Sequence, residues 1–500
     1  MATGESRTVL RVLIGVLVGA LLLCAGGVAV GAWFWNSRVV NTTGRVEFDT
    51  PLTVPPLAES RIDSQGRRVF DLRAQAGQQD FNPGAMTRTW GFNGDYLGPT
   101  LRAKRGEQVM VNVVNGLAEE TTVHWHGMHL PAEMDGGPHQ PVAPGATWSP
   151  SWRIDQPAAT LWYHPHPHGM TEKHVYRGLA GLFLLDDEHT SRLALPQRYG
   201  IDDVPVIVQD RNFDRHGQFD DGASFGGVGI LGDTLLVNGT VGPYLDVTTE
   251  RVRLRLLNGS TARSYNFGLA DDRNFHLIGT DGGLLPAPHL TRRIQLSPGE
   301  RAEIVVALSP GERAVLRSYP PDLGTGFVDR FTGGGDSFDV LQLRAAATLT
   351  PSPEPPAVLA PVERLDPADA VTTRQFRLTG RNINGRTMEM DRIDEVVTLG
   401  TTEIWEITNR DGTPHNFHIH DVQFQVLSVA GAAPPPDLDG WKDTIFLQPN
   451  RTVRIIMRFA DYADPERPYM YHCHLLLHED QGMMGQFVVV EPSDMNPKKR

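Results

Sequence analysis

A strand-like run that ends in asparagine occurs three times in this chain of 500 residues. The copies span residues 106–115, 249–258 and 400–409, and each has the alternating or β-branched side chains of a strand. A proline-led turn follows each copy, and it starts 40 residues beyond the asparagine in the second and third copies, at Pro298 and Pro449. A chain that repeats one strand-and-turn unit three times is predicted to contain three similar β-domains.

The length of the chain agrees with three domains, because single domains usually contain roughly 100 to 150 residues. The 51 glycines and 37 prolines suit turn-rich strands. We therefore predict an all-β fold of three Greek-key β-sandwich domains at residues 45–190, 195–345 and 372–492. Six prolines between residues 346 and 371 predict a stiff linker there.

The N-terminal part of the chain contains an uncharged run from Val12 to Phe34. This run is long enough to cross a bilayer as a helix, and it is longer than the usual apolar core of a cleaved signal. We interpret residues 1–44 as an N-terminal transmembrane anchor or signal segment. The large C-terminal part is then expected outside the cytoplasm, anchored to the cell membrane, or secreted if the segment is cleaved. A lipoprotein acylated at Cys24 is a further alternative.

The charge of the chain argues against one class of partner, and its cysteines argue against disulfide bonds. A net charge of -13 and a pI near 5.8 argue against nucleic acid, because binding to phosphates needs clustered Lys and Arg. The only cysteines are Cys24 and Cys473, so no structural disulfide is expected. We expect a monomer that meets the membrane only through its N-terminal segment.

Histidine pairs of the form His-x-His occur four times. On a strand, two residues separated by one point to the same face, so each pair presents two imidazoles together. A single pair is usually only part of a polar strand face. Four pairs, one of which flanks Cys473, are too many for coincidence and therefore indicate a metal cluster. The pairs are His124 and His126, His164 and His166, His418 and His420, and His472 and His474.

The position of these pairs within the repeat shows where a cluster would form. Nine and eleven residues beyond the asparagine lie His124 and His126 in the first copy and His418 and His420 in the third. The middle copy has Phe267 and Leu269 at the same positions. The cluster is therefore predicted between the first and third domains, with the middle domain as a spacer.

A second kind of site follows from Cys473. An imidazole at His478 and a thioether at Met483 follow it at intervals of five residues, and His415 can supply a second imidazole. A thiolate, two imidazoles and a weak thioether are the ligands of a blue-copper centre.

Together these segments closely resemble the ligand signature of the multicopper oxidases, which include laccases, cuprous oxidases and bilirubin oxidases. The resemblance covers nearly all of the chain after about residue 45 and implies cupredoxin domains that hold four copper ions. The type 2 ion would be bound by His124 and His418, and the type 1 ion by His415, Cys473 and His478, with Met483 as axial ligand. The type 3 pair would be bound by His126, His164, His166, His420, His472 and His474.

The resemblance also implies an activity. Reducing substrates such as phenols, aromatic amines or Cu(I) would lose one electron at a time at the type 1 copper, and dioxygen would be reduced to water at the trinuclear cluster. Asp135 and Glu479 resemble the carboxylates that relay protons in this family, and Asp411 resembles the acidic residue that helps to bind substrate. The alternatives are a turn residue for Asp135 and Asp411 and a solvated surface residue for Glu479.

The chain departs from its relatives in two places. Asn416 stands where many relatives have proline, a change that removes no ligand. The methionine-rich insert of bacterial cuprous oxidases is reduced to Met388 and Met390, which on a strand are more often core residues. Without this insert, we expect bulky phenols and aromatic amines to reach an exposed edge of a type 1 imidazole.

Three other readings compete with the oxidase. A zinc site would need four ligands and leaves this larger set unexplained. A simple blue-copper electron carrier would give the eight paired histidines no role. A copper-free scaffold of the same fold, as occurs among bacterial division proteins, would be expected to have lost ligands that this chain retains.

Overall fold

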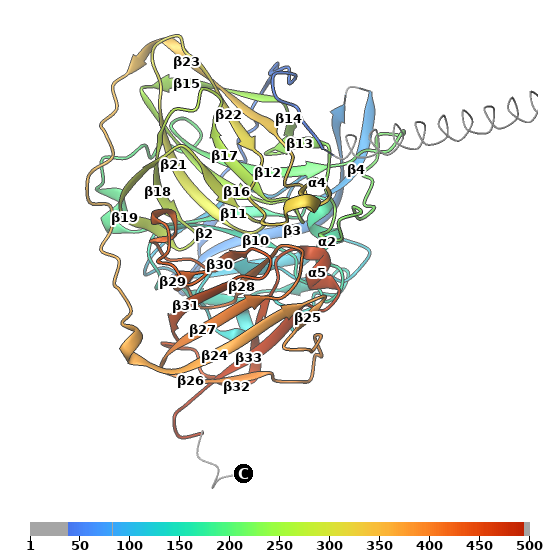
Figure 1. Cartoon of the computed structure of the whole chain (residues 1–500), viewed down its shortest axis with the longest axis vertical. Helices are drawn as coiled ribbons and strands as arrows, with labels where there is room; N and C mark the ends of the chain where they lie inside the picture. Colours follow the sequence, from blue (N-terminus) through green and yellow to red (C-terminus); the bar gives the residue numbers. More distant parts are fainter. Residues whose placement is uncertain (1–38, 83, 495–500) are drawn as a thin grey trace, which may run out of the picture.

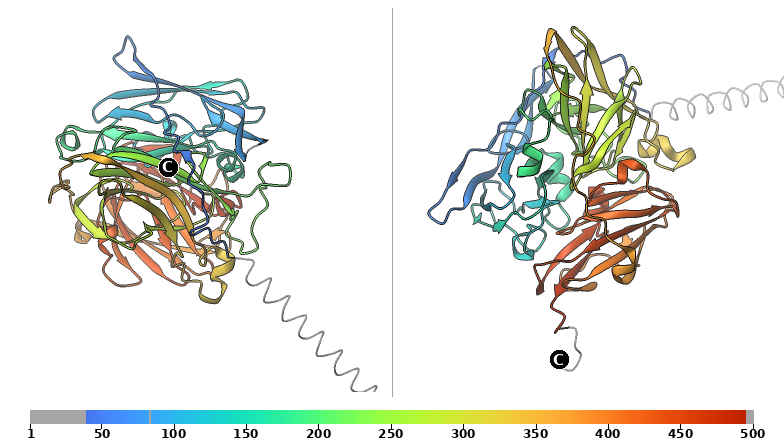
Figure 2. Two further views of the ribbon diagram at one scale, coloured as in Figure 1. Left: turned by 90° about the horizontal axis from the view of Figure 1, so that it is seen from above. Right: turned by 90° about the vertical axis from the view of Figure 1, so that its left-hand side faces the viewer.

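The computed structural model describes residues 39–494 except Pro83, and these residues form three β-sandwiches (Figure 1). Strands make up 47% of the structure and helices 7%, so the predicted all-β fold is confirmed. In the right-hand view of Figure 2, the first sandwich, in blue and cyan, lies beside the other two, and the second lies above the third.

The first sandwich packs a six-stranded sheet against a four-stranded one. Val109, Val111 and Val113 of β6 all point into the core between the sheets, as strict alternation requires. The larger sheet contains β2 (Ser60–Ile62), β3 (Arg68–Asn82), β4 (Ala85–Phe92), β6 (Gln108–Asn115), β8 (Thr147–Trp148) and β9 (Ser151–Arg153). The smaller sheet contains β5 (Leu101–Lys104), β7 (His124–His126), β10 (Ala159–His164) and β11 (Gly181–Asp186).

The second sandwich is the largest and contains a six-stranded and a seven-stranded sheet. The first of these consists of β1 (Thr50–Pro51), β15 (Pro243–Thr249), β17 (Tyr265–Leu269), β20 (Ile294–Leu296), β22 (Arg313–Tyr319) and β23 (Phe338–Thr350). The other consists of β12 (Asp203–Arg211), β13 (Thr234–Val237), β14 (Thr240–Val241), β16 (Arg251–Asn258), β18 (Phe275–Thr280), β19 (Gly283–Thr291) and β21 (Arg301–Ala307).

The third sandwich contains two five-stranded sheets around a core that includes Phe376, Trp405 and Phe417. One sheet consists of β24 (Ala370–Thr379), β25 (Asn382–Ile383), β27 (Thr402–Asn409), β29 (Phe424–Val429) and β31 (Thr452–Arg458). The other consists of β26 (Glu395–Thr398), β28 (His415–Ile419), β30 (Thr444–Leu447), β32 (Asp464–His472) and β33 (Met484–Val490).

The repeated asparagine ends a strand in each sandwich and has the same partners each time. Asn115 ends β6, Asn258 ends β16 and Asn409 ends β27. The Nδ2 group of each donates to two backbone carbonyls, one in the loop that follows and one just before the proline-led turn. Because a buried amide needs partners on all its polar atoms, this residue ties the two loops of every sandwich together.

Short helices lie between the strands. They are η1 (Ala132–Met134), α2 (Thr171–Tyr176), α3 (Glu188–Ser191), η2 (Gly326–Val328), α4 (Asp329–Thr332), η3 (Pro367–Asp369), η4 (Pro436–Leu438) and α5 (Leu476–Asp480). Within the described part of the chain, no helix has the length and apolar character needed to span a bilayer. The predicted membrane or signal segment lies largely outside the described residues.

Two boundaries differ from the predicted ranges. Strand β1 pairs with β15 of the second sandwich, although its residues were grouped with the first domain. A two-residue parallel strand has no alternation that the sequence could show. Strand β23 continues to Thr350, and the proline-rich segment then runs along the outside of the molecule to η3 (Figure 1).

Candidate metal centres

Strand pairing brings the four histidine pairs to the boundary between the first and third sandwiches. In the first, β7 pairs with β10 so that His124 lies opposite His164. In the third, β28 pairs with β32 so that His418 lies opposite His472. All eight paired histidines are at most 1% exposed. Each sandwich thus presents one buried edge of imidazoles to the other.

These eight histidines form three groups whose ring nitrogens lie within 4.8 Å of one another. Each group contains residues from both outer sandwiches. The groups are His124, His126 and His418; His126, His164 and His474; and His166, His420 and His472. The last two groups are the six predicted type 3 ligands divided into two sets of three, and the first contains both predicted type 2 ligands.

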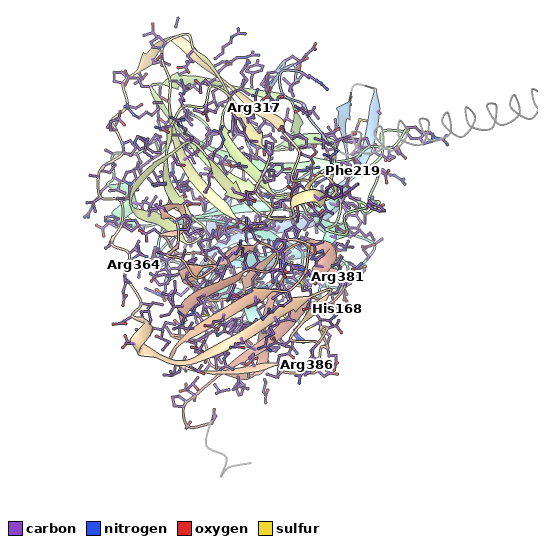
Figure 3. The ribbon with its side chains drawn as sticks, in the orientation of Figure 1. His168, Phe219, Arg317, Arg364, Arg381 and Arg386 are labelled. Carbon is purple, nitrogen blue, oxygen red and sulfur yellow. The ribbon has the colours of Figure 1, made fainter. Side chains whose placement is uncertain are left out.

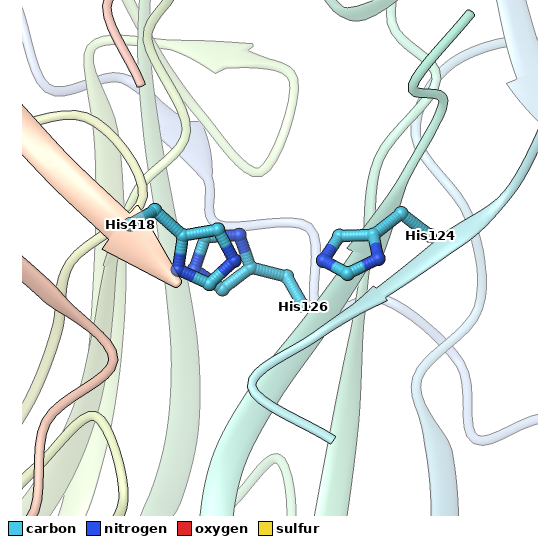
Figure 4. A group of neighbouring side chains, drawn as sticks. All are labelled: His124, His126 and His418. Carbon is cyan, nitrogen blue, oxygen red and sulfur yellow. The ribbon is translucent and has the colours of Figure 1, made fainter. Parts of the chain in front are cut away.

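The rings of the two sandwiches stack directly on one another. His124 stacks on His420 with ring centres 3.8 Å apart. His126 stacks on His418 at 3.7 Å, with ring planes within 11° (Figure 4). The cluster therefore depends on the docking of two sandwiches rather than on either alone.

The free ring nitrogens test whether a metal fits this cluster. The Nδ1–H groups of His124 and His418 donate to the backbone carbonyls of Asp135 and Asp443, at 3.0 and 2.8 Å. Their Nε2 atoms then carry bare lone pairs, and both are buried without a hydrogen-bond partner. Leaving buried polar atoms unpaired is costly, so this arrangement fits two nitrogens that bind a metal.

The remaining nitrogens also face one another. The Nε2 atoms of His166 and His420 lie 3.1 and 3.2 Å from that of His472. His126 is oriented the other way, because its Nε2 lies 3.1 Å from Asp443 Oδ1 and its Nδ1 faces His164 Nε2 at 3.4 Å. Nitrogen ligands lie about 2.0 Å from a metal, so two that bind the same ion are separated by roughly 3 Å or a little more. The nitrogen–nitrogen distances here therefore suit imidazoles that share one ion.

Burial keeps these imidazoles neutral. Loss of solvent, together with the neighbouring imidazoles, holds the pKa values of His126, His164, His418 and His420 well below the usual range. The same cause lowers the pKa of His474 to about 3. Because only a neutral imidazole binds a metal, these five histidines are in their ligand form at physiological pH.

The predicted type 1 ligands form a separate group in the third sandwich. Cys473 Sγ lies 3.5 Å from His415 Nδ1 and 3.7 Å from His478 Nδ1, and the two nitrogens are 3.0 Å apart. Met483 is fully buried in the same core, and its carbonyl accepts from the Cys473 N–H at 3.1 Å. Strand β32 ends at His472, so Cys473 lies in the loop that follows it.

The outer side of the type 1 group is closed, unlike the exposed imidazole edge that was expected. Both histidines are fully buried. Asp411 Oδ2 lies 2.7 Å from His415 Nε2, and the Gly227 carbonyl lies 3.0 Å from His478 Nε2. Gly227 belongs to a loop of the second sandwich, and the sequence of the third domain carries no sign of this cover.

The two predicted relay carboxylates are buried within the histidine cluster. Asp135 Oδ2 lies 2.7 Å from His420 Nδ1. Glu479 lies 3.0 Å from His472 Nδ1 and 3.3 Å from His166 Nδ1, and neither of its oxygens has a hydrogen-bond partner. Although burial raises the pKa of Glu479, the adjacent histidines outweigh it and hold the pKa well below its usual range. Glu479 is therefore not a surface residue.

A charged residue of the middle sandwich also acts on the cluster and was missed in the sequence. Arg301 donates to both oxygens of Asp443 at 2.8 and 2.7 Å, and Asp443 in turn holds His126 Nε2. All three side chains are buried. No local motif marks Arg301 or Asp443, because their roles depend on the contact between two sandwiches. The middle domain is thus more than the predicted spacer.

Known protein families match this chain over all three sandwiches. Multicopper oxidase family models match residues 73–190, 212–314 and 357–493. The chain belongs to the multicopper oxidase family. Among curated multicopper oxidases, mco of Staphylococcus haemolyticus is 38% identical over 443 residues, which is 87% of this chain and 91% of that protein.

Two other relatives show the range of the family. Cell division protein FtsP of Escherichia coli is 36% identical over 94% of this chain and 96% of its own length. The laccase of Pediococcus acidilactici is 36% identical, with a TM-score of 0.81 over 90% of this chain and 95% of its own. The laccase-like multicopper oxidase CueO of Ochrobactrum sp., with oxidase activity towards lignin model compounds, is 38% identical, with a TM-score of 0.81 over 88% of this chain and 100% of its own.

Proposed function

We propose that this chain is an oxidase that removes single electrons from reducing substrates at a type 1 copper and reduces dioxygen to water at a cluster of three coppers. The observation that carries this proposal is the convergence of eleven buried histidine and cysteine side chains into a type 1 set and a trinuclear set, with Met483 buried in the same core as Cys473. Copper supplies the one-electron redox chemistry when it is bound. Four electrons and four protons convert one dioxygen into two waters.

The chain itself supplies the link between the two sets. Cys473 belongs to the type 1 group, and its covalent neighbours His472 and His474 belong to the trinuclear group. A continuous bonded path therefore joins the two sets within three residues. The carboxylate of Glu479, buried among the histidines and next to His472 and His166, is suited to pass protons to that site.

Copper content and stoichiometry test this proposal. Protein that is purified after copper loading is expected to hold four coppers per chain, to be intensely blue and to consume one dioxygen for four one-electron donors. One copper or none, or production of hydrogen peroxide in place of water, would contradict the proposal.

A copper-free scaffold is the second candidate, because proteins named FtsP match this chain as well as the oxidases do. Loss of ligands would be expected in such a scaffold, whereas all twelve predicted ligand residues are present here and eleven of them lie in the three-residue groups. Copper-loaded chain without oxygen uptake in the presence of several donors would favour the scaffold.

For the reducing substrate we propose small aromatic donors that dock over the Gly227 loop. Phe225 is 75% exposed in this loop. Arg381, which is labelled in Figure 3, donates to the Gly227 carbonyl at 2.6 Å. The ring offers a stacking surface, and the cation favours phenolates. Arg381 disfavours Cu(I) next to Asp411, because like charges repel. Both histidines are covered, so electrons would cross the Gly227 peptide instead of an exposed imidazole edge.

Steady-state oxygen uptake with a phenol and with stabilised Cu(I) separates the two donor classes. Arg381→Met is expected to raise KM for the phenol several-fold and to leave kcat for Cu(I) unchanged or higher. Arg386→Met, on the same sandwich and 62% exposed at its side chain, is the control. Rapid Cu(I) oxidation that Asp411→Ala slows, together with phenol oxidation only after excess copper is added, would identify a cuprous oxidase instead.

We further propose that the copper domains lie outside the cytoplasm, held by the uncharged run from Val12 to Phe34. Mass analysis of the mature protein should find this run retained. A mature N-terminus after residue 34 would indicate a secreted protein.

A further inference from the structure

Asn416 joins the type 1 ligand loop to the second sandwich. Its side chain is fully buried, and its Oδ1 accepts from the His474 backbone N–H at 2.6 Å. Its Nδ2 donates to the Pro298 carbonyl at 2.8 Å and to Ser297 Oγ at 3.1 Å. The same Oδ1 lies 3.6 Å from Cys473 Sγ. One amide therefore contacts both the cysteine sulfur and the proline-led turn of the neighbouring sandwich.

The partners of this amide determine its orientation. The backbone N–H of His474 can only donate, so the atom that faces it is oxygen. The Pro298 carbonyl can only accept, and Ser297 Oγ donates its one proton to Glu300 Oε2 at 2.7 Å, so the atom that faces both is the NH2 group. A flipped amide would lose all of these bonds. The oxygen, and not the NH2 group, is therefore the atom beside the sulfur.

An oxygen at this distance acts on the electron affinity of the centre. The carbonyl end of the amide dipole is partly negative, and the site is buried, so the interaction is weakly screened. Reduction adds negative charge to the copper and sulfur unit, which the oxygen opposes. Polarity and hydrogen bonding around the cysteine sulfur are known to set the potential of type 1 centres.

We infer that Asn416 is a positioning residue that lowers the reduction potential of the type 1 centre through its Oδ1 and fixes the Cys473–His474 link against the Pro298 turn. The inference rests on the proposed function, because it requires copper in the type 1 set. It also gives a physical role to a residue that the ligand pattern alone passes over.

The test compares three side chains of similar size at this position: Leu, the native Asn, and Asp. The potential is measured by anaerobic titration of the blue absorption. Asn416→Leu removes the negative oxygen and should give the highest potential, while Asn416→Asp adds negative charge and should give the lowest. A purely structural role would shift both variants in the same direction, because both lose the bonds of Nδ2.

Ser297→Ala is the matched control. It removes one partner of Nδ2 and leaves Oδ1 beside the sulfur, so the potential should remain within error of wild type. Asn416→Ser replaces the Leu variant if that variant does not fold, and it should also raise the potential. Equal potentials in all variants, or a lower potential in Asn416→Leu, would overturn the inference while the proposed function stands. A wild-type chain without a blue band would overturn both.

Discussion

The two candidate centres are assembled in different ways. The type 1 ligands all come from the third sandwich, within residues 415–483, whereas every trinuclear group includes side chains of both outer sandwiches. The trinuclear rings stack across an interface, but the type 1 ligands share one core. The third sandwich can therefore arrange the predicted type 1 set by itself, while the predicted trinuclear set forms only when two domains dock.

The middle sandwich contributes a residue to none of the ligand groups found among the described residues, yet it touches both centres. Gly227 covers His478 on the type 1 side. Arg301 holds Asp443 on the trinuclear side, and Gly299 approaches the rings of His126 and His474 closely. The described residues of the middle sandwich, none of which is in a ligand group, thus help to set the surroundings of both candidate metal sites.

The largest effect is expected from a substitution of Cys473, the residue that joins the two candidate centres covalently. Cys473→Ser should abolish the blue absorption and oxidase turnover, because the thiolate is lost, and should leave three coppers per chain. Visible spectra and copper quantitation check this outcome. Loss of all copper would show that the two centres do not load independently.

The converse change is His124→Ala on the trinuclear side. It should retain the blue band but reduce oxygen uptake by more than the roughly 100-fold typical of an outer-shell change. Reductant should bleach the blue band, and air should restore it only slowly. Turnover at the wild-type rate would mean that the first sandwich contributes no essential ligand.

A smaller effect is expected where the middle sandwich supports the cluster. Asp443→Asn weakens the hold on His126, which should lower the copper affinity of the trinuclear set by about 10- to 100-fold and spare the blue band. The variant should also be destabilised, because Arg301 loses one of its two buried ion-pair partners and keeps only Asp281. Asp339→Asn, which weakens a partly exposed ion pair with Arg317, is the control for stability.

The smallest effect is expected on the pH dependence of folding stability, through a buried carboxyl group next to the Gly227 loop. Glu172 Oε1 is buried without a partner and lies beside Gly229 of this loop. Burial raises the pKa of Glu172 from 4.5 to about 7, against hydrogen bonds from Ile230 and Thr261 that lower it. The pKa of Glu172 is higher in the folded state than in the unfolded state. Its contribution to folding stability is therefore fully present below about pH 4.5 and is lost as the pH rises through 7.

Glu172→Gln removes this titration and should raise Tm by about 2 to 4 °C at pH 8, with no change at pH 4.5. Thermal melts at both pH values measure it. An equal shift at the two pH values would assign the effect to packing instead of charge.

The sequence by itself determined the type and number of domains, because a strand-turn unit ending in asparagine occurs three times and its alternation is local. The four His-x-His pairs indicated a metal cluster, and the resemblance to the multicopper oxidases assigned the residues of both ligand sets. Asp135 and Glu479 were named as well, but only the structure shows Glu479 buried among the histidines.

Only the tertiary structure decided which atoms surround these ligands. Gly227, Arg301, Asp443 and the Asn416 amide act through contacts between residues that are far apart in the chain, and nothing local in the sequence encodes such contacts. The expected open imidazole edge was wrong for the same reason, because the cover comes from another domain. The ligand residues could be named from local sequence motifs and their resemblance to a family, whereas access, proton positions and potential depend on how the three sandwiches pack.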